Sequence, residues 1–173
     1  DKAASMERRR LAKTGMLRSA HMLGNEEEII FAATDLLADT KLAPELSNEA
    51  HYYRAKAYLD AGKTDGAMED LKVLAKDTRN VYGAEAKYKV AQIYFDGGQT
   101  DKAEQEVLNY IEVSTPHTYW LARSFVLLAD VYMKLGRNLD AKQYLLSLKQ
   151  NYQADDDIAG MIESRLEKLK TEN

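Results

Sequence analysis

Three histidines are the residues of this sequence best suited to acid–base or metal chemistry. His21, His51 and His117 are 30 and 66 residues apart and share no local spacing. Protein metal sites usually draw two or more ligands from one short motif. The chain has no cysteine, which excludes disulfides, thiol catalysis and zinc sites built on thiolates. We therefore interpret the histidines as ordinary helix-face or loop residues and predict no metal site.

Two acidic runs, Asp155–Asp157 and Glu26–Glu28, are the next candidates for a metal site. The alternating spacing and the distal Glu of a calcium loop are missing from both. Acidic side chains at a helix N-terminus interact favourably with the helix dipole and can cap the first turn, and we predict that role for both runs. The sequence also contains no phosphate-binding glycine loop, metalloprotease helix motif or nucleophile elbow. We predict no cofactor and no enzymatic activity.

A basic run and a high tyrosine content are the features that could indicate nucleic-acid binding. Arg8–Arg10 follow Glu7, and residues 1–46 hold 7 basic and 8 acidic side chains. The whole chain has 24 Lys or Arg against 28 Asp or Glu, a net charge of −4. Its 11 tyrosines are not accompanied by a basic groove. We predict a solvated helix face for the basic run and no nucleic-acid partner.

The composition is typical of a folded, helical protein. The chain has 173 residues, of which 45% are hydrophobic and 30% charged, with only 9 Gly and 2 Pro to interrupt helices. No apolar run approaches the ~20 residues of a membrane span, so we predict no insertion into a membrane. The chain begins with Asp1, and we interpret it as a fragment or a processed product.

A fixed pattern of Ala, Tyr and Gly recurs three times along the chain. A Tyr stands four residues before each Gly, an Ala seven before it and another Ala five after it. These slots hold Ala55, Tyr58, Gly62 and Ala67; Ala91, Tyr94, Gly98 and Ala103; and Ala129, Tyr132, Gly136 and Ala141. The glycines are 36 and 38 residues apart, and a degraded copy surrounds Gly24. Such a period is typical of a helical repeat protein.

Each repeat predicts two helices, because its apolar and small residues follow helical spacing without strand alternation. The Gly between them suits a left-handed turn, and Thr64, Thr100 and Asn138 are predicted to cap the second helices. The whole chain predicts nine helices, over about residues 3–23, 25–40, 46–61, 64–77, 81–97, 100–113, 117–135, 138–151 and 155–171.

The repeated slots resemble the signature of the tetratricopeptide repeat, over roughly residues 48–153 strongly and 10–41 weakly. Its further apolar slots hold Leu71 and Leu74, Val107 and Tyr110, and Leu145 and Leu148. The present repeats are 36–38 residues long instead of about 34. The fourth position of the repeat is usually aromatic but holds His51, Lys87 and Phe125. This slot is normally buried, so we predict a half-buried His51 with satisfied hydrogen bonds.

The resemblance implies an all-α fold, a right-handed superhelical array of helix-turn-helix repeats with a C-terminal capping helix. We predict a single domain over residues 1–173. It contains a degenerate repeat at about 3–41, repeats at about 46–79, 81–115 and 117–153, and a capping helix at about 155–171 with an apolar stripe of Ile158, Met161, Ile162, Leu166 and Leu169.

In this family the first helix of each repeat lines a concave surface that binds partners. Carried over residue by residue, the inward slots hold Glu49, Tyr52, Lys56 and Leu59; Glu85, Tyr88, Gln92 and Phe95; and Arg123, Val126, Asp130 and Met133, followed by Asp60, Asp96 and Lys134. Tyr52, Tyr88 and Val126 form one predicted apolar row, and Leu59, Phe95 and Met133 form a second. The Lys and Asn set of the chaperone-binding branch is missing.

The resemblance implies a protein-interaction scaffold that binds a partner peptide or protein on its concave face. The alternative is a structural spacer or oligomerisation module of a larger envelope protein, and a homo-oligomer is possible. The long, acidic repeats are similar to those of bacterial cell-envelope proteins, and residues 119–152 are similar to the C-terminal part of large multi-repeat proteins. This similarity implies a location in the periplasm or cell envelope, with the cytoplasm as the alternative. An exposed apolar groove would favour the scaffold, and a groove filled by the chain's own termini would favour the spacer.

Overall fold

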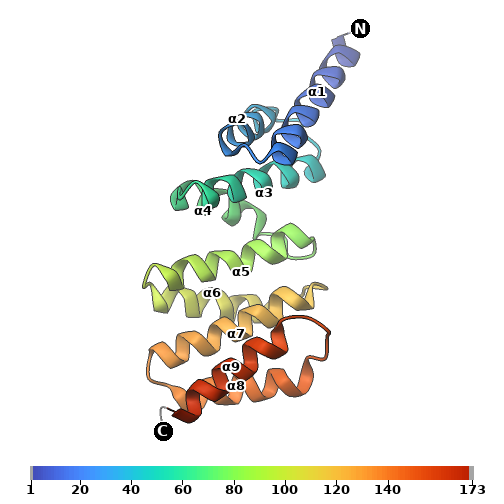
Figure 1. The fold of residues 1–173 in the computed structure, drawn as a ribbon. Helices are drawn as coiled ribbons and strands as arrows, with labels where there is room; N and C mark the ends of the chain where they lie inside the picture. Colours follow the sequence, from blue (N-terminus) through green and yellow to red (C-terminus); the bar gives the residue numbers. More distant parts are fainter. Residues whose placement is uncertain (1, 172–173) are drawn as a thin grey trace. The chain divides into compact units, whose positions relative to one another are not determined.

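Nine α-helices follow one another in the computed structural model, which describes residues 2–171 (Figure 1). The helices are α1 (Lys2–Leu23), α2 (Glu26–Leu37), α3 (Pro44–Asp60), α4 (Thr64–Leu74), α5 (Val81–Asp96), α6 (Thr100–Glu112), α7 (Thr118–Lys134), α8 (Asn138–Asn151) and α9 (Ile158–Thr171). They pack in sequential pairs as a tetratricopeptide-like array. The nine predicted helices are confirmed, with every boundary within about three residues of its prediction.

The turn inside each pair uses a glycine with positive φ. Gly24, Gly62, Gly98 and Gly136 have φ of 65 to 74°, as their position after a helix predicts. The prediction that Thr64, Thr100 and Asn138 cap the second helices is wrong. Each of them is the first residue of its helix, and the N-caps are Lys63, Gln99 and Arg137, which make no side-chain cap bond. A single residue separates the glycine from the helix, so that residue takes the N-cap place.

The acidic runs lie at helix N-termini. Asp156 Oδ1 accepts a hydrogen bond from the backbone N–H of Ile158 at 3.0 Å, so Asp155–Asp157 precede α9 and its start lies later than predicted. Glu26–Glu28 form the first turn of α2, where Asn25 supplies the capping oxygen to the N–H of Glu28 at 3.2 Å. The predicted role at helix starts is confirmed for both runs.

The helices group into two compact units, α1–α4 up to Lys76 and α5–α9 from Asp77 onward. The core of the first unit includes Leu17, Ala33, Leu36 and Ala50, and that of the second includes Leu128, Val131, Leu145 and Ile158. The alanines predicted to allow close helix packing are at most 1% exposed, namely Ala55, Ala67, Ala91, Ala103, Ala129 and Ala141. No helix within residues 2–171 is long and apolar enough to span a membrane.

Candidate functional site

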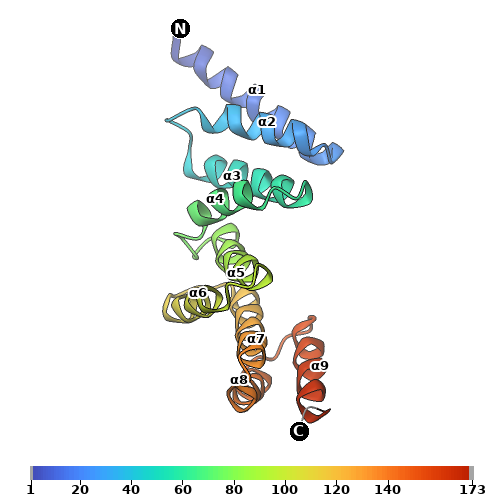
Figure 2. The ribbon, with the colours of Figure 1, turned by 90° about the vertical axis from the view of Figure 1, so that its left-hand side faces the viewer.

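Helix α9 packs beside α7, which, like α5, is the first helix of a repeat in the second unit. Arg123 of α7 contacts Tyr88 of α5, and Arg165 of α9 contacts Asp130 of α7. Figure 2 shows α9 beside α7, on the side opposite α6. We call the surface of α5, α7 and α9 that carries the predicted partner-binding slots the first-helix face of the second unit. The sequence predicts only a capping role for α9, but α9 also contributes Arg165 and Lys168 to this face.

Arg123 lies at the centre of an aromatic cluster on this face. Its guanidinium donates to the hydroxyl of Tyr119 at 3.0 Å and to that of Tyr88 at 3.3 Å, and it lies 5.1 Å from the centre of the Tyr88 ring. Asp157 Oδ2 is 3.5 Å from Arg123 Nη1. Burial acts to lower the pKa of Arg123, but the bonds to Tyr119 and Tyr88 outweigh it and raise the pKa. Arg123 is therefore a charged residue whose partners come from its own chain.

The first predicted apolar row is not an exposed surface in the second unit. Tyr88 is 6% and Val126 3% exposed, and both belong to the core of this unit. The Tyr88 ring lies 5.6 Å from the ring of Trp120, which the repeat pattern did not single out. These two side chains therefore do not form the exposed apolar groove that would favour the scaffold, because α7 and the apolar side of α9 pack in the same cluster.

The second predicted row lines an open cavity. Phe95 and Met133 are half-buried and border a cavity of about 400 Å³ together with Asp130, Lys134 and Lys168. Of these five residues only Lys168 was outside the predicted slots, because α9 lacks the repeat signature. This is the part of the face where predicted apolar and charged side chains meet around accessible space.

The polar slots between the rows are bonded within the chain. The Tyr88 hydroxyl donates to Gln92 Oε1 at 2.8 Å, and Gln92 Nε2 donates to Asp96 Oδ1 at 2.8 Å. Both carboxylate oxygens of Asp130 accept from Arg165, at 2.7 Å each. Glu85 is half-buried near the start of α5. The structure thus brings together Tyr88, Gln92 and Arg123 at one place and Phe95, Asp130 and Met133 at another.

The predicted slots of the first unit lie on α3. Arg18 of α1 donates to both carboxylate oxygens of Glu49, at 2.7 and 2.9 Å, and this hydrogen bonding lowers the pKa of Glu49. The Lys56 ammonium lies 5.6 Å from the centre of the Tyr52 ring. Tyr52 and Leu59 are half-buried and Lys56 is exposed. The ion pair from α1 was not predicted, because it joins residues 31 positions apart that no repeat slot relates.

The histidines act in packing and hydrogen bonding. His51 is half-buried and its Nδ1 donates to Asp70 at 2.7 Å, which confirms the prediction for this slot. His21 stacks on Tyr53 with ring centres 4.0 Å apart, and His117 Nε2 donates to the carbonyl of Arg79 at 2.9 Å. Among residues 2–171 no three His, Asp or Glu side chains gather as a metal-binding group.

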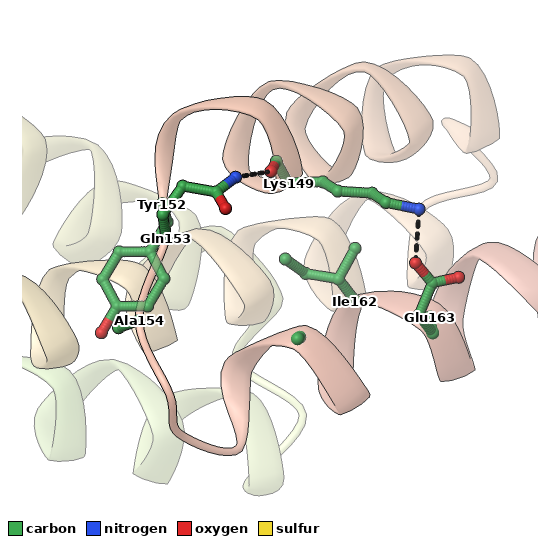
Figure 3. A pocket seen from close by; sticks show the side chains of 7 residues that line it. Lys149, Tyr152, Gln153, Ala154, Ile162 and Glu163 are labelled. Carbon is green, nitrogen blue, oxygen red and sulfur yellow. Dashed lines mark hydrogen bonds and ion pairs between the residues drawn. The ribbon is translucent and has the colours of Figure 1, made fainter.

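A smaller hollow of about 240 Å³ lies between the end of α8 and α9 (Figure 3). The Lys149 ammonium and the Glu163 carboxylate are ion-paired at 2.5 Å across it, and Gln153 donates to the Lys149 carbonyl at 3.2 Å. Burial and a bond to Asp156 raise the pKa of Tyr152 to about 12, so its hydroxyl stays protonated. These groups bond one another, and their arrangement holds the loop before α9.

Sequence models of the tetratricopeptide repeat match residues 49–77 and 122–150. The chain contains tetratricopeptide repeats. The first match covers most of α3 and all of α4, and the second covers most of α7 and α8. These are two of the repeats identified from the Ala, Tyr and Gly slots. No curated protein matches the chain in sequence. Tetratricopeptide repeats are generally protein-interaction modules and typically lack catalytic activity.

Two solved structures share this fold. Both are of nearly identical TPR-like repeats from a Podosopora anserina protein described as a kinesin light chain, and one is a single-substitution variant. The variant has a TM-score of 0.58 and 16% identity, over 94% of this chain and 93% of that chain. The other has a TM-score of 0.56 and 16% identity, over 94% of each chain. At this identity the similarity establishes the fold alone.

Proposed function

We propose that the first-helix face of the second unit binds an extended or helical segment of a partner protein. The observation that supports this most directly is the open cavity of about 400 Å³ bordered by Phe95, Met133 and charged side chains. Apolar groups at the centre of a recognition surface supply most of its affinity, and a polar rim supplies register. Phe95 and Met133 are the apolar contacts in this proposal, and Lys134 and Lys168 form the rim.

Recognition here is non-covalent and depends on the spacing of the repeats. An extended segment binds through side chains that enter pockets, and a helical one through its apolar face. Asp130 is already neutralised by Arg165, so the two lysines dominate the charge of the rim. The contributions of Glu49, Tyr52, Lys56 and Leu59 of the first unit to binding stay predictions.

A specific observation also favours the alternative, a structural spacer or oligomerisation module of a larger envelope protein. Asp157 pairs with Arg123 and Arg165 with Asp130, so the C-terminal segment already contacts two predicted partner-binding residues. A surface engaged by its own chain is what a spacer would have. The periplasm or cell envelope stays our proposed location, on the similarity of the repeats to those of envelope proteins.

Affinity capture from a native cell lysate tests the binding proposal. We would compare the wild type with Phe95→Ala/Met133→Ala and with Leu139→Ala/Leu146→Ala. Leu139 and Leu146 are exposed on α8 of the same unit. The control variant therefore removes a similar apolar area outside the cavity. We expect a protein captured by the wild type and the control but not by the cavity variant. Equal capture by all three, or no capture, would overturn the proposal and favour the spacer.

A further inference from the structure

Helix α1 exposes large apolar side chains on the side that faces away from its own unit. Thr14, Leu17 and Ala20 form its buried side, whereas Leu11 is 76% and Met22 86% exposed. Figures 1 and 2 show α2 beside α1 and no other described helix of the first unit against its opposite side. Several large apolar side chains exposed on one helix are uncommon on a monomer surface and indicate an interface.

The exposed side has the form of a helix-packing stripe. Ala4, Leu11, Gly15, Ser19 and Met22 follow one another at intervals of three, four or seven residues, which places them on one face of the helix. The centre of the stripe is small. A Cβ added at Gly15 would meet nothing within 4 Å, so the backbone there is open to close approach by another helix.

Charge is distributed unevenly along α1 and the start of α2. Helix α1 has six Lys or Arg residues and one Glu. Three of the six are paired inside the first unit, Arg10 with Asp39, Lys13 with Asp35 and Arg18 with Glu49. Arg8 and Arg9 are exposed and form no ion pair with the described residues. At the other end of α1, the exposed Glu26, Glu27 and Glu28 open α2.

We propose that this face binds a second copy of the chain, with the two α1 helices antiparallel and a two-fold axis at Gly15. Arg8 and Met22 each lie seven residues from Gly15, about 10.5 Å along the helix axis. The two-fold axis therefore places Arg8 of one copy beside Met22 of the other. Leu11 then packs over Ser19 and Gly15 of the second copy, where small side chains leave room.

The charges determine the choice of occupant. An isologous interface requires a surface that is complementary to itself. In the antiparallel arrangement, Arg8 and Arg9 of one copy lie near the first turn of α2 of the other, where Glu26–Glu28 supply three carboxylates. A parallel pair would instead place the basic ends together. This inference uses a different surface from the partner-binding proposal and does not rest on it.

Sedimentation of the full chain over a range of concentrations is the first test. We expect the wild type to approach twice its 19.6 kDa mass and Leu11→Asp to remain monomeric. Leu11 is exposed, so the substitution should leave the helical circular dichroism unchanged. Leu139→Asp, an equally exposed position on α8, is the matched control and should dimerise like the wild type. A monomeric wild type, or a dimeric Leu11→Asp, would overturn the proposal.

A charge exchange tests the direction of the helices. Arg8→Glu/Arg9→Glu alone, or Glu26→Arg/Glu27→Arg alone, should weaken the dimer by about tenfold or more. In the antiparallel arrangement, a mixed dimer of the two double variants pairs unlike charges at both ends, and the quadruple variant likewise restores every pair. The quadruple variant should therefore regain the wild-type dissociation constant. Failure to regain it would overturn the antiparallel arrangement.

The absence of cysteine allows a direct test of the axis. Gly15→Cys places two thiols next to each other only if the helices cross at this residue, within the roughly 7 Å between Cα atoms that a disulfide allows. Mild oxidation should give a covalent dimer of Gly15→Cys and none of Ser147→Cys, an exposed control on α8. If both variants crosslink equally, or Gly15→Cys does not, the two-fold axis does not lie at Gly15 and the proposal fails.

Discussion

The same contact between paired helices is ionic in the first unit and aromatic in the last repeat of the second. In three repeats a first-helix residue contacts the residue 19 positions later in the second helix. His51 donates to Asp70 at 2.7 Å and Lys87 to Glu106 at 3.1 Å, whereas the Phe125 and Tyr144 rings are 6.1 Å apart. The residue three positions after the first member also changes from charged to apolar along the repeats: it is Arg54, then Val90, then Leu128.

The comparison shows that the repeat determines which two positions are in contact but not whether the contact is ionic or aromatic. In the first unit Asp70 is 1% exposed and accepts hydrogen bonds from Arg54 at 2.7 and 2.9 Å as well as from His51. A buried carboxylate is tolerated only when such bonds offset its desolvation. The aromatic contact contains no carboxylate whose desolvation must be offset, and Leu128 beside it is fully buried. The first unit should therefore be much less tolerant of losing one member.

Removing the carboxylate from the ionic contact should have the largest effect. Asp70→Ala leaves the half-buried Arg54 without its carboxylate partner, and we expect the free energy of unfolding to fall by about 3–5 kcal/mol. Urea unfolding followed by circular dichroism measures this loss. A loss below about 1 kcal/mol, the value typical of an exposed ion pair, would show that the contact does not act as a buried one.

The matched variant copies the aromatic contact into the first unit. His51→Phe/Arg54→Leu/Asp70→Tyr replaces the ionic members by the residues of the last repeat at the same three positions. Replacing a buried ion pair by packed apolar groups is often neutral or stabilising by about 1–4 kcal/mol. We expect the triple variant to be at least as stable as the wild type. If it is as unstable as Asp70→Ala, the two contacts are not interchangeable.

Truncating the aromatic contact should have the next largest effect. Phe125→Ala should lower the free energy of unfolding by about 2–3 kcal/mol, less than the loss for a fully buried Phe because Phe125 is only half-buried. Trp120, the only tryptophan, reports unfolding of this unit by fluorescence. The loss should not change with added salt. Lys87→Ala, at the equivalent slot, should cost about 1 kcal/mol and less at high salt; equal salt dependence would contradict the comparison.

The features that depend on local spacing could be predicted from the sequence. The helices, the left-handed glycines and the buried alanines follow from residues close in sequence, so a repeated pattern of Ala, Tyr and Gly was sufficient. The half-buried His51 was predictable because its slot recurs. The cavity residues Phe95, Asp130, Met133 and Lys134 occupied predicted slots for the same reason.

The features that could not be predicted depend on distant neighbours. Tyr88 has the spacing of a surface residue on α5, but Trp120 and Arg123 of the next repeat cover it. The role of α9 was missed because Arg165 and Lys168 occupy no repeat slot, and their proximity to Asp130 arises from helix packing. Likewise, an aromatic or ionic residue at the fourth position does not reveal its partner until the second helix is in place.

Overpacking the alanine that both units share should have a smaller effect. Ala55→Leu and Ala91→Leu add bulk at the same slot, where both alanines are 1% exposed. We expect each to lower the free energy of unfolding by about 1–3 kcal/mol. Ala154→Leu, at an exposed loop position, is the control and should have little effect. A neutral result at Ala55 with a loss at Ala91 would mean that the units differ in packing as well as in polarity.

The smallest expected effect is a dependence of stability on pH that the Asp70 contact should have and the Phe125–Tyr144 contact should lack. Burial acts to raise the pKa of Asp70, but the hydrogen bonds from Arg54 and His51 outweigh it, and the pKa is lowered. A carboxyl whose pKa is lower in the folded than in the unfolded chain stabilises the fold above its unfolded pKa of about 3.9. That stabilisation is lost as the pH falls through the folded-state pKa, because both states are then protonated.

Asp70→Asn isolates this dependence, because it keeps the shape of the side chain and cannot ionise. The advantage of the wild type over Asp70→Asn should be constant at neutral pH and shrink as the pH falls below about 4. Urea unfolding at a series of pH values measures the difference, and Phe125→Ala measured alongside should lose the same free energy at every pH. An advantage of the wild type that persists unchanged in acid would mean that Asp70 contributes through its hydrogen-bonding shape and not through its charge. The charge of Asp70 would then be unimportant to the first unit, and its hydrogen bonds alone would matter.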